Sequence, residues 1–125
     1  MSSSTTTAVV RDDVSTAALD SWPIAPEQVV AGDPQASGVL LWKSADSRLA
    51  NGVWACTPGT FDWVHADETL CVVEGRATIT PQGGEPFDIG PGSVAFFPEG
   101  TRTRWQVHET IRKAFHLHSE AGLPF

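Results

Sequence analysis

The sequence has few basic residues, no long apolar run and only two cysteines, and each shortage excludes a class of protein. Lys and Arg together number 8 and are scattered, and the formal net charge is −7. A chain without a basic stripe is not expected to bind the phosphate backbone of nucleic acid. No window approaches the roughly 18 consecutive apolar residues of a membrane span, and the N-terminus lacks the pattern of a secretory signal. We therefore expect a cytoplasmic protein with no nucleic-acid or membrane partner.

The two cysteines, Cys56 and Cys71, both lie inside apolar runs. In a reducing compartment this placement favours two buried free thiols over a disulfide bridge. No neighbouring residue in the sequence would stabilise a thiolate, so we expect both cysteines to serve in packing.

The length and the N-terminal composition predict one domain with short tails. A chain of 125 residues with 41% hydrophobic content can form one core and is too short for two. The first residues are rich in Ser and Thr and lack apolar periodicity, which predicts that they stay mobile. We expect a flexible N-terminal tail over residues 1–20, a barrel over residues 21–120 and a C-terminal tail over residues 121–125.

From Trp22 onward, short apolar runs recur every eight to twelve residues and are rich in Val, Ile, Thr, Phe and Trp. This spacing is typical of an antiparallel sandwich or barrel. Gly and Pro supply the turns between the runs. The best helix candidate is "APEQVVAG", which fits a strand equally well. The pattern predicts an all-β fold.

The run "SVAFFP" is apolar on both of its faces, with Val94 and Phe96 on one side and Ala95 and Phe97 on the other. Such a strand should be covered on both sides. A partner subunit or the N-terminal segment of the chain could supply the second cover. We predict a homodimer that buries one of these faces.

Two phrases, "ETLCVVEG" and "GPGSVAFFPEGTRTRW", resemble the two motifs of the cupins. Together with "GVWACTPGTFDW" and "WQVHETIRK", they are similar to the small cupin subfamily that includes (S)-ureidoglycine aminohydrolase-type domains. The resemblance covers about residues 50 to 115. It implies a single-domain cupin jelly-roll barrel of six to eight strands, with a pocket inside it.

The chain departs from the cupin motifs at the positions that ordinarily hold metal-binding histidines. Counting back from Glu68 puts two of these positions on Phe61 and Trp63, and the alternative register gives no histidine either. The position in the second motif is Thr103. Only Glu68 remains of four expected ligands. One carboxylate does not hold zinc, iron or manganese tightly, so we expect no metal cofactor.

Aromatic residues at the former ligand positions suit a pocket for a small organic molecule. The predicted substrate-binding residues are Trp54, Phe61, Trp63, Thr103 and Trp105. Glu68 is the predicted catalytic residue, because desolvation in a partly apolar pocket would raise its pKa and allow it to act as a general acid or base. Alternatively, Glu68 only hydrogen-bonds to strand backbone or to an arginine such as Arg104.

Two histidines keep a metal site open as an alternative. His116 and His118 are two apart on a predicted strand and share one face. If that face points inward, they could join Glu68 in binding zinc, manganese or iron. The outward arrangement is favoured, since Phe115 and Leu117 suit a core better than histidine does. His65 is expected at the rim of the pocket.

Three functions are compatible with these observations. The leading one is a cupin that binds a small organic molecule and acts on it through Glu68 without a tightly bound metal. The second is a metal-dependent hydrolase or oxygenase that uses Glu68, His116 and His118. The third is a binding domain without catalysis, because a fold does not determine a function.

Overall fold

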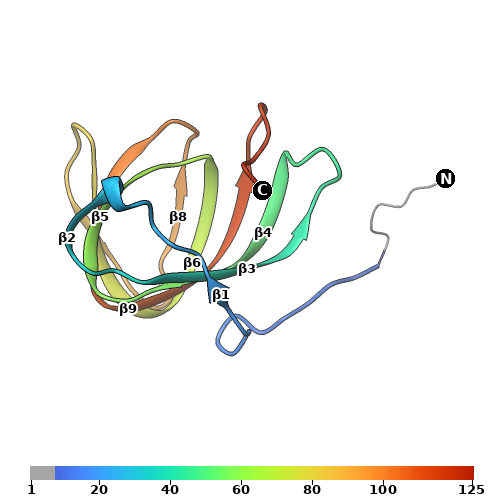
Figure 1. Cartoon of the computed structure of the whole chain (residues 1–125), viewed down its shortest axis with the longest axis horizontal. Coiled ribbons are helices and arrows are strands. Elements are labelled where there is room, and N and C mark those ends of the chain that lie inside the picture. The colour runs from blue at the N-terminus through green and yellow to red at the C-terminus, as the bar shows by residue number, and fades with distance from the viewer. Residues whose placement is uncertain (1–7) are drawn as a thin grey trace.

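The computed structural model describes residues 8–125 and shows one curled antiparallel sheet (Figure 1). The strands are β1 (Asp20–Ser21), β2 (Val29–Gly32), β3 (Ala36–Lys43), β4 (Leu49–Cys56), β5 (Gly59–Val64), β6 (Asp67–Pro81), β7 (Phe87–Ile89), β8 (Val94–Phe97) and β9 (Arg102–His118). The helix candidate forms one 3-10 turn, η1 (Pro26–Gln28), and then continues as β2. The prediction of an all-β jelly-roll barrel is confirmed.

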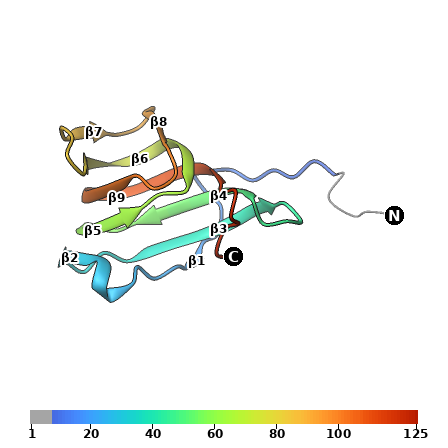
Figure 2. The same ribbon diagram turned by 90° about the horizontal axis from the view of Figure 1, so that it is seen from above.

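Strand β9 is the centre of the sheet. Along one edge it pairs with β4 and β5, and along the other edge it pairs with β6. Strand β6 in turn pairs with β7 and β8, while β3 and β1 continue the sheet beyond β4 (Figure 2). Because β9 lies between β6 on one side and β4 and β5 on the other, its inward side chains lie in the middle of the barrel wall.

Strands β6 and β9 are longer than the sequence pattern suggests. The runs "TLCVVEG" and "RATITP" form one bent strand, as do "TRWQVHE" and "RKAFHLH". The pairing of β6 with β9 shifts register between Val72 and Ala77, so the buried positions change from even to odd numbers. Gly75 permits this bend: its φ is +81°, and a Cβ there would lie 2.0 Å from the carbonyl oxygen of Thr110.

Apolar side chains fill part of the barrel interior. The core consists of Ala36, Cys56, Phe61, Leu70, Val72, Ala77, Ile79, Ile89, Phe97, Trp105, Val107 and Ile111. Cys56 and Cys71 are both free, as predicted, but only Cys56 is buried, whereas Cys71 is half-buried. Burial raises the pKa of the Cys56 thiol to about 12, although the nearby Lys113 charge acts to lower it. This thiol therefore stays protonated at neutral pH.

Both terminal segments pack against the barrel. On the N-terminal side, the Arg112 guanidinium donates hydrogen bonds to the carbonyl oxygens of Val14 and Ala17. At the other end, Leu123 is buried and its N–H donates to the Ser47 carbonyl oxygen at 2.7 Å. The predicted mobility of residues 1–7 lies outside the described part of the chain. In the described part, no helix is long and apolar enough to span a membrane.

Strand β8 has one covered and one open face. Phe97 is buried and Ala95 packs partly against the core. Val94 and Phe96 point the other way and are 70% and 60% exposed. Residues 8–125 of a single chain therefore leave this apolar pair uncovered.

Candidate functional site

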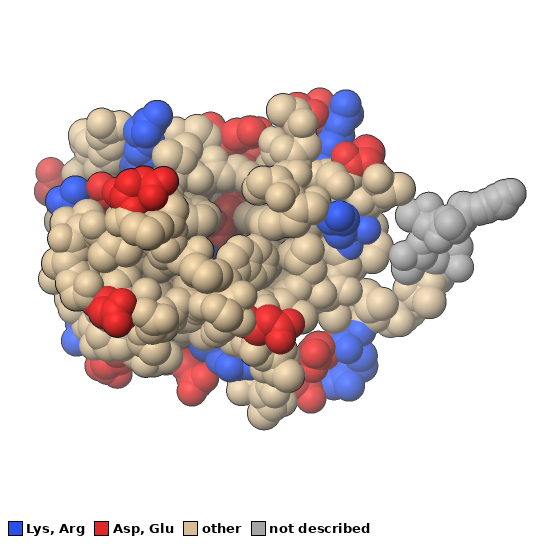
Figure 3. All heavy atoms as spheres, in the orientation of Figure 1, with Lys and Arg blue, Asp and Glu red and all other residues tan. Residues whose placement is uncertain are grey.

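The barrel holds a partly open cavity of about 410 Å³. Glu68 and Lys113 are the only charged side chains in its wall, which is otherwise mostly apolar. The wall consists of Trp22, Pro23, Ile24, Trp54, Phe61, Trp63, Val64, Ala66, Glu68, Trp105, Lys113, Phe115, Leu117, Leu123, Pro124 and Phe125. Figure 3 shows a hollow near the centre of one face, with acidic atoms inside it. This volume is in the range of cavities that enclose small organic molecules.

Tryptophan and phenylalanine side chains form one wall of the cavity. Phe61 and Trp105 come from paired positions on β5 and β9, and their rings stack with centroids 6.0 Å apart. Trp54 from β4 meets both rings edge-on, at 6.2 and 5.9 Å. Trp63 lies two residues after Phe61 on the same face and is 37% exposed, so it stands near the opening. These rings offer flat apolar surface to a ligand.

The structure places five of the six predicted site residues on this cavity. Trp54, Phe61, Trp63, Glu68 and Trp105 all line it. Thr103 points inward but is 4% exposed and is not part of the wall. Arg104, offered above as a partner for Glu68, instead binds Asp62 on the outer surface at 2.8 Å.

Glu68 forms a buried ion pair with Lys113, a site residue that was not predicted from the sequence. Lys113 Nζ donates to Glu68 Oε2 at 2.7 Å, and both side chains are less than 10% exposed. The ammonium also lies over the rings of Trp54 and Trp105, 4.6 and 4.8 Å from their centroids. The signal for Lys113 was its parity: it lies two residues before Phe115 and four before Leu117, on the face of the strand that was expected to point inward.

The expected rise in the pKa of Glu68 is not found. Burial does raise the pKa of this carboxyl group, but the Lys113 charge and the hydrogen bonds from His65 and Lys113 outweigh burial and lower the pKa to about 2. Glu68 is thus held as a carboxylate at neutral pH. The general-acid role is not supported by this geometry, and the base role is weakened, because a carboxylate with so low a pKa accepts protons poorly.

His65 does not lie at the rim, contrary to expectation. It is 2% exposed and stacks on Phe97 with ring centroids 4.1 Å apart. Its Nδ1 is 2.9 Å from Glu68 Oε1, and its Nε2 is 2.8 Å from Thr103 Oγ1. The tight turn between β5 and β6 folds this residue inward: the His65 N–H donates to the Thr101 carbonyl oxygen, and its own carbonyl accepts from Gly100.

The polar side chains behind the cavity form one directed chain of hydrogen bonds. Trp105 Nε1 can only donate, and it donates to Thr103 Oγ1 at 3.1 Å. The Thr103 hydroxyl then donates to His65 Nε2, and His65 Nδ1–H donates to Glu68, which can only accept. A neutral His65 with its proton on Nδ1 is the form that satisfies every donor and acceptor of this network. In that form Glu68 and Lys113 are the two charges of the group, and they cancel.

The connectivity of Thr103, His65 and Glu68 is that of a hydroxyl, imidazole and carboxylate triad. A nucleophile must contact the substrate, however, and Thr103 is buried behind the wall and already accepts from Trp105. We interpret the three residues as a support that fixes the orientation of Glu68.

His116 and His118 face away from the cavity. His116 is exposed, whereas Lys113, Phe115 and Leu117 of the same strand line the interior. The alternative ligand set of Glu68, His116 and His118 is therefore not brought together. In residues 8–125, no group of three or more His, Cys, Asp or Glu side chains is arranged to hold a metal ion.

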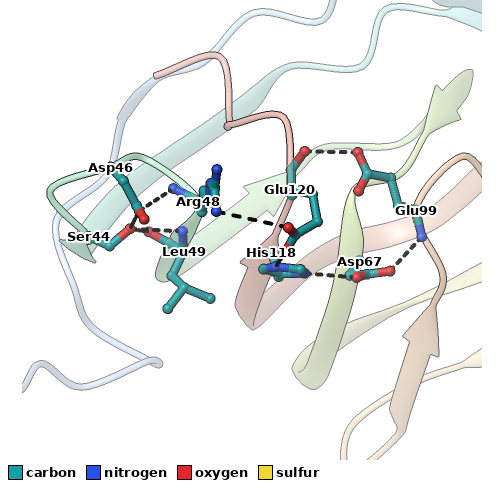
Figure 4. A network of polar contacts seen from close by, with 9 residues as sticks. Ser44, Asp46, Arg48, Leu49, Asp67, Glu99, His118 and Glu120 are labelled. Carbon is teal, nitrogen blue, oxygen red and sulfur yellow. Dashed lines mark hydrogen bonds and ion pairs between the residues drawn. The ribbon is translucent and has the colours of Figure 1, made fainter.

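A surface network of polar contacts links the start of the C-terminal segment to β6 and to the turn before β9 (Figure 4). His118 lies between Asp67 and Glu120, with contacts of 3.0 Å to each. The adjacent Ser119 hydroxyl donates to Glu99 at 2.8 Å. Beyond this anchor, the ring of Phe125 packs edge-on against Trp22, with centroids 5.3 Å apart, and both side chains line the cavity. The last residues thus form part of the wall.

The fold and this cavity define a cupin, and comparisons with known proteins agree. Residues 43–115 match the EutQ-like cupin domain family, so the chain belongs to that family. No match was found among curated proteins.

Solved structures give the same fold. A protein of unknown function from the DUF861 family of Pseudomonas syringae pv. tomato is 25% identical, with a TM-score of 0.73 over 81% of this chain. The match spans 44% of that protein, so this chain corresponds to less than half of it. A DUF861-family protein of Thermotoga maritima is 35% identical over 52% of this chain and 75% of its own, with a TM-score of 0.50. The EutQ protein of Clostridium difficile is 24% identical over 68% of this chain and 63% of its own, with a TM-score of 0.60, and shows the fold alone.

Proposed function

We propose that this protein binds a small organic molecule in the barrel cavity, in contact with the Glu68 and Lys113 ion pair. The observation that carries the proposal is an oriented ion pair in the wall of an otherwise apolar cavity of about 410 Å³. Burying a charged pair in apolar surroundings costs free energy. Such a pair often stabilises a protein no more than apolar side chains of similar size would. The presence of this pair beside an open cavity is therefore better explained by ligand recognition than by stability.

A second candidate is an enzyme in which Glu68 acts as a base on the bound molecule. The specific observation in its favour is the Lys113 ammonium 2.7 Å from the carboxylate, because a cation there could stabilise negative charge that develops on a substrate oxygen. The low pKa of Glu68 and the engagement of both its oxygens argue for binding as the primary function. If catalysis occurs, Glu68→Gln should lower turnover by about 10²–10⁴-fold, a far larger change than in ligand affinity.

The residues present do not suit the metal that the cupin motifs ordinarily imply. Phe61, Trp63 and Thr103 replace three ligands of the (S)-ureidoglycine aminohydrolase-type resemblance, and none of these can substitute for imidazole. Glu68 already has a cation beside it, and the Lys113 ammonium would repel a second one. We propose that the site works without a tightly bound metal.

The proposal extends to the assembly and location of the protein. The exposed pair of Val94 and Phe96 on β8 supports a homodimer in which a second copy of the chain covers this face. The two free thiols, Cys56 and Cys71, suit a reducing compartment and hence the cytoplasm.

Blocking the cavity tests the binding function. Four of the five tryptophans, Trp22, Trp54, Trp63 and Trp105, line the cavity, so their fluorescence reports ligand entry. We expect small aromatic molecules to change this fluorescence in a saturable way. Ala66→Phe, in the cavity wall, should weaken the binding of these molecules at least tenfold. Ala45→Phe, in the exposed turn after β3, is the matched control and should leave binding unchanged. Equal binding by both variants would place the ligand elsewhere.

A further inference from the structure

We propose that the cavity selects uncharged flat molecules that carry a carbonyl oxygen, and that Lys113 is the residue that recognises this oxygen. The inference rests on the proposed binding function and specifies its ligand class. It comes from three features of the wall: the spare donors of Lys113, the position of its ammonium over two indole rings, and the nearby carboxylate of Glu68.

Lys113 has donors left over for a ligand. An ammonium carries three N–H groups, and Glu68 Oε2 takes one of them. The faces of Trp54 and Trp105 also lie near Nζ and attract the charge, but they do not replace an oxygen acceptor. Buried polar groups are ordinarily satisfied by hydrogen bonds. A ligand carbonyl in the cavity would supply one, strengthened by the charge of the donor.

Cationic ligands are disfavoured because the protein already fills its aromatic cage with a cation of its own. Clustered tryptophans beside a carboxylate would otherwise suit an organic ammonium. Here the Lys113 ammonium lies over Trp54 and Trp105 and pairs with Glu68. A ligand cation would meet a like charge in an apolar cavity, where such repulsion is poorly screened.

Anionic ligands are disfavoured by Glu68. Two oxygens that accept hydrogen bonds from one ammonium lie within about 5 Å of each other. A ligand carboxylate on Lys113 would therefore sit close to the Glu68 carboxylate, which is ionised. Because the Lys113 and Glu68 charges cancel, an uncharged ligand adds no net charge beside the pair. A charged ligand of either sign leaves a net charge in apolar surroundings, which costs free energy.

The shape of the wall favours a flat ligand body. The stacked Phe61 and Trp105 rings and the more exposed Trp63 offer broad aromatic surfaces along one side. An aromatic ring can lie against these surfaces in an offset or edge-on arrangement.

Three probes with the same benzyl group test the ligand class. Benzyl methyl ketone is uncharged with one acceptor, phenylacetate is an anion, and phenethylamine is a cation. Titrations at neutral pH, followed by tryptophan fluorescence, should show the ketone binding at least tenfold more tightly than either charged probe. Lys113→Met should reduce the affinity for the ketone by about 10- to 100-fold, the usual effect of losing a charge-assisted hydrogen bond. Lys43, the only other lysine of the sequence, is exposed, so Lys43→Met should leave the affinity for the ketone unchanged.

A second measurement does not depend on a folded variant. The infrared carbonyl stretch of the ketone bound to the wild-type protein should move to lower frequency than in an apolar solvent, as expected for a hydrogen bond from an ammonium. An unshifted stretch, or a charged probe that binds as tightly as the ketone, would refute this ligand class while leaving the binding function intact. Failure of all three probes to perturb the wild-type fluorescence at millimolar concentration would count against both proposals.

Discussion

At the scale of single residues, the decisive feature is the dependence of Glu68 and Lys113 on each other. Each is buried, and each is the close charge partner of the other at 2.7 Å. Removing one partner leaves a charge without compensation in apolar surroundings, which typically costs about 3–5 kcal/mol of stability. Removing both avoids that cost.

A double-mutant cycle measures this coupling. We expect Lys113→Met and Glu68→Gln each to lower the free energy of unfolding in urea by roughly 3–5 kcal/mol. The double variant leaves neither charge unpaired, so its loss should fall short of the sum of the two single losses by about 3 kcal/mol or more. Additive losses would show that the two charges do not interact as the structure indicates.

The low pKa of Glu68 predicts a loss of stability in acid. Its folded pKa of about 2 lies below the usual value of 4.5. The ion pair therefore contributes fully above pH 4.5, and its contribution is lost as the pH falls toward 2. Because Asp46, Asp62 and Asp67 also have lowered pKa values, the relevant quantity is the difference in unfolding free energy between wild type and Glu68→Gln. That difference should shrink between pH 4.5 and 2. A difference that stays constant over this range would disagree with an ionised, paired Glu68.

At the scale of elements, alternation along strands explains what could be predicted. The inward positions Phe61, Trp63 and Trp105 follow from period two, and β5 and β9 place them together. The bend of β6 at Gly75 was not predictable, because a register shift arises from pairing with β9 and not from local composition. His65 was misplaced for a similar reason: a turn residue has no periodicity to fix its direction, and its burial depends on partners 3 and 38 positions away.

Lys113 shows a different limit of sequence interpretation. A lysine inside a strand usually points to water, so composition argued against an inward position. Its burial depends on Glu68, 45 residues earlier, and on two tryptophans from separate strands. Such a compensation is visible only after the strands are paired.

The C-terminal anchor belongs to the same scale. The hydrogen bond with Asp67 raises the pKa of His118, and the neighbouring Glu120 adds to this effect. The stabilising interaction is complete below about pH 6.5 and is lost as the pH rises through the raised folded pKa. We expect His118→Ala to lower the unfolding free energy more at pH 6 than at pH 9. His116→Ala, exposed on the same strand, should show no such dependence. Identical behaviour of the two variants would argue against the anchor.

At the scale of the whole molecule, the apolar face of β8 predicts the assembly. Val94 and Phe96 are largely exposed in the single chain. Burying both side chains between two copies would remove apolar surface from water, which favours association. Light scattering at micromolar concentration should give the mass of a dimer for the wild type and of a monomer for Phe96→Asp. Val30→Asp, at an exposed apolar position on β2, is the control and should stay dimeric. A monomer mass for the wild-type protein would contradict the proposed dimer interface.

The central claim is that an ion pair, and not a metal, is the polar part of a ligand-binding cavity. The most direct test is a calorimetric titration with benzyl methyl ketone, carried out with and without a chelator. The protein is purified without a metal-binding tag, and its metal content is determined by elemental analysis. We expect substoichiometric metal, one binding site per chain, and the same affinity in the presence of the chelator. Binding that requires stoichiometric zinc, manganese or iron, or that disappears with the chelator, would contradict it.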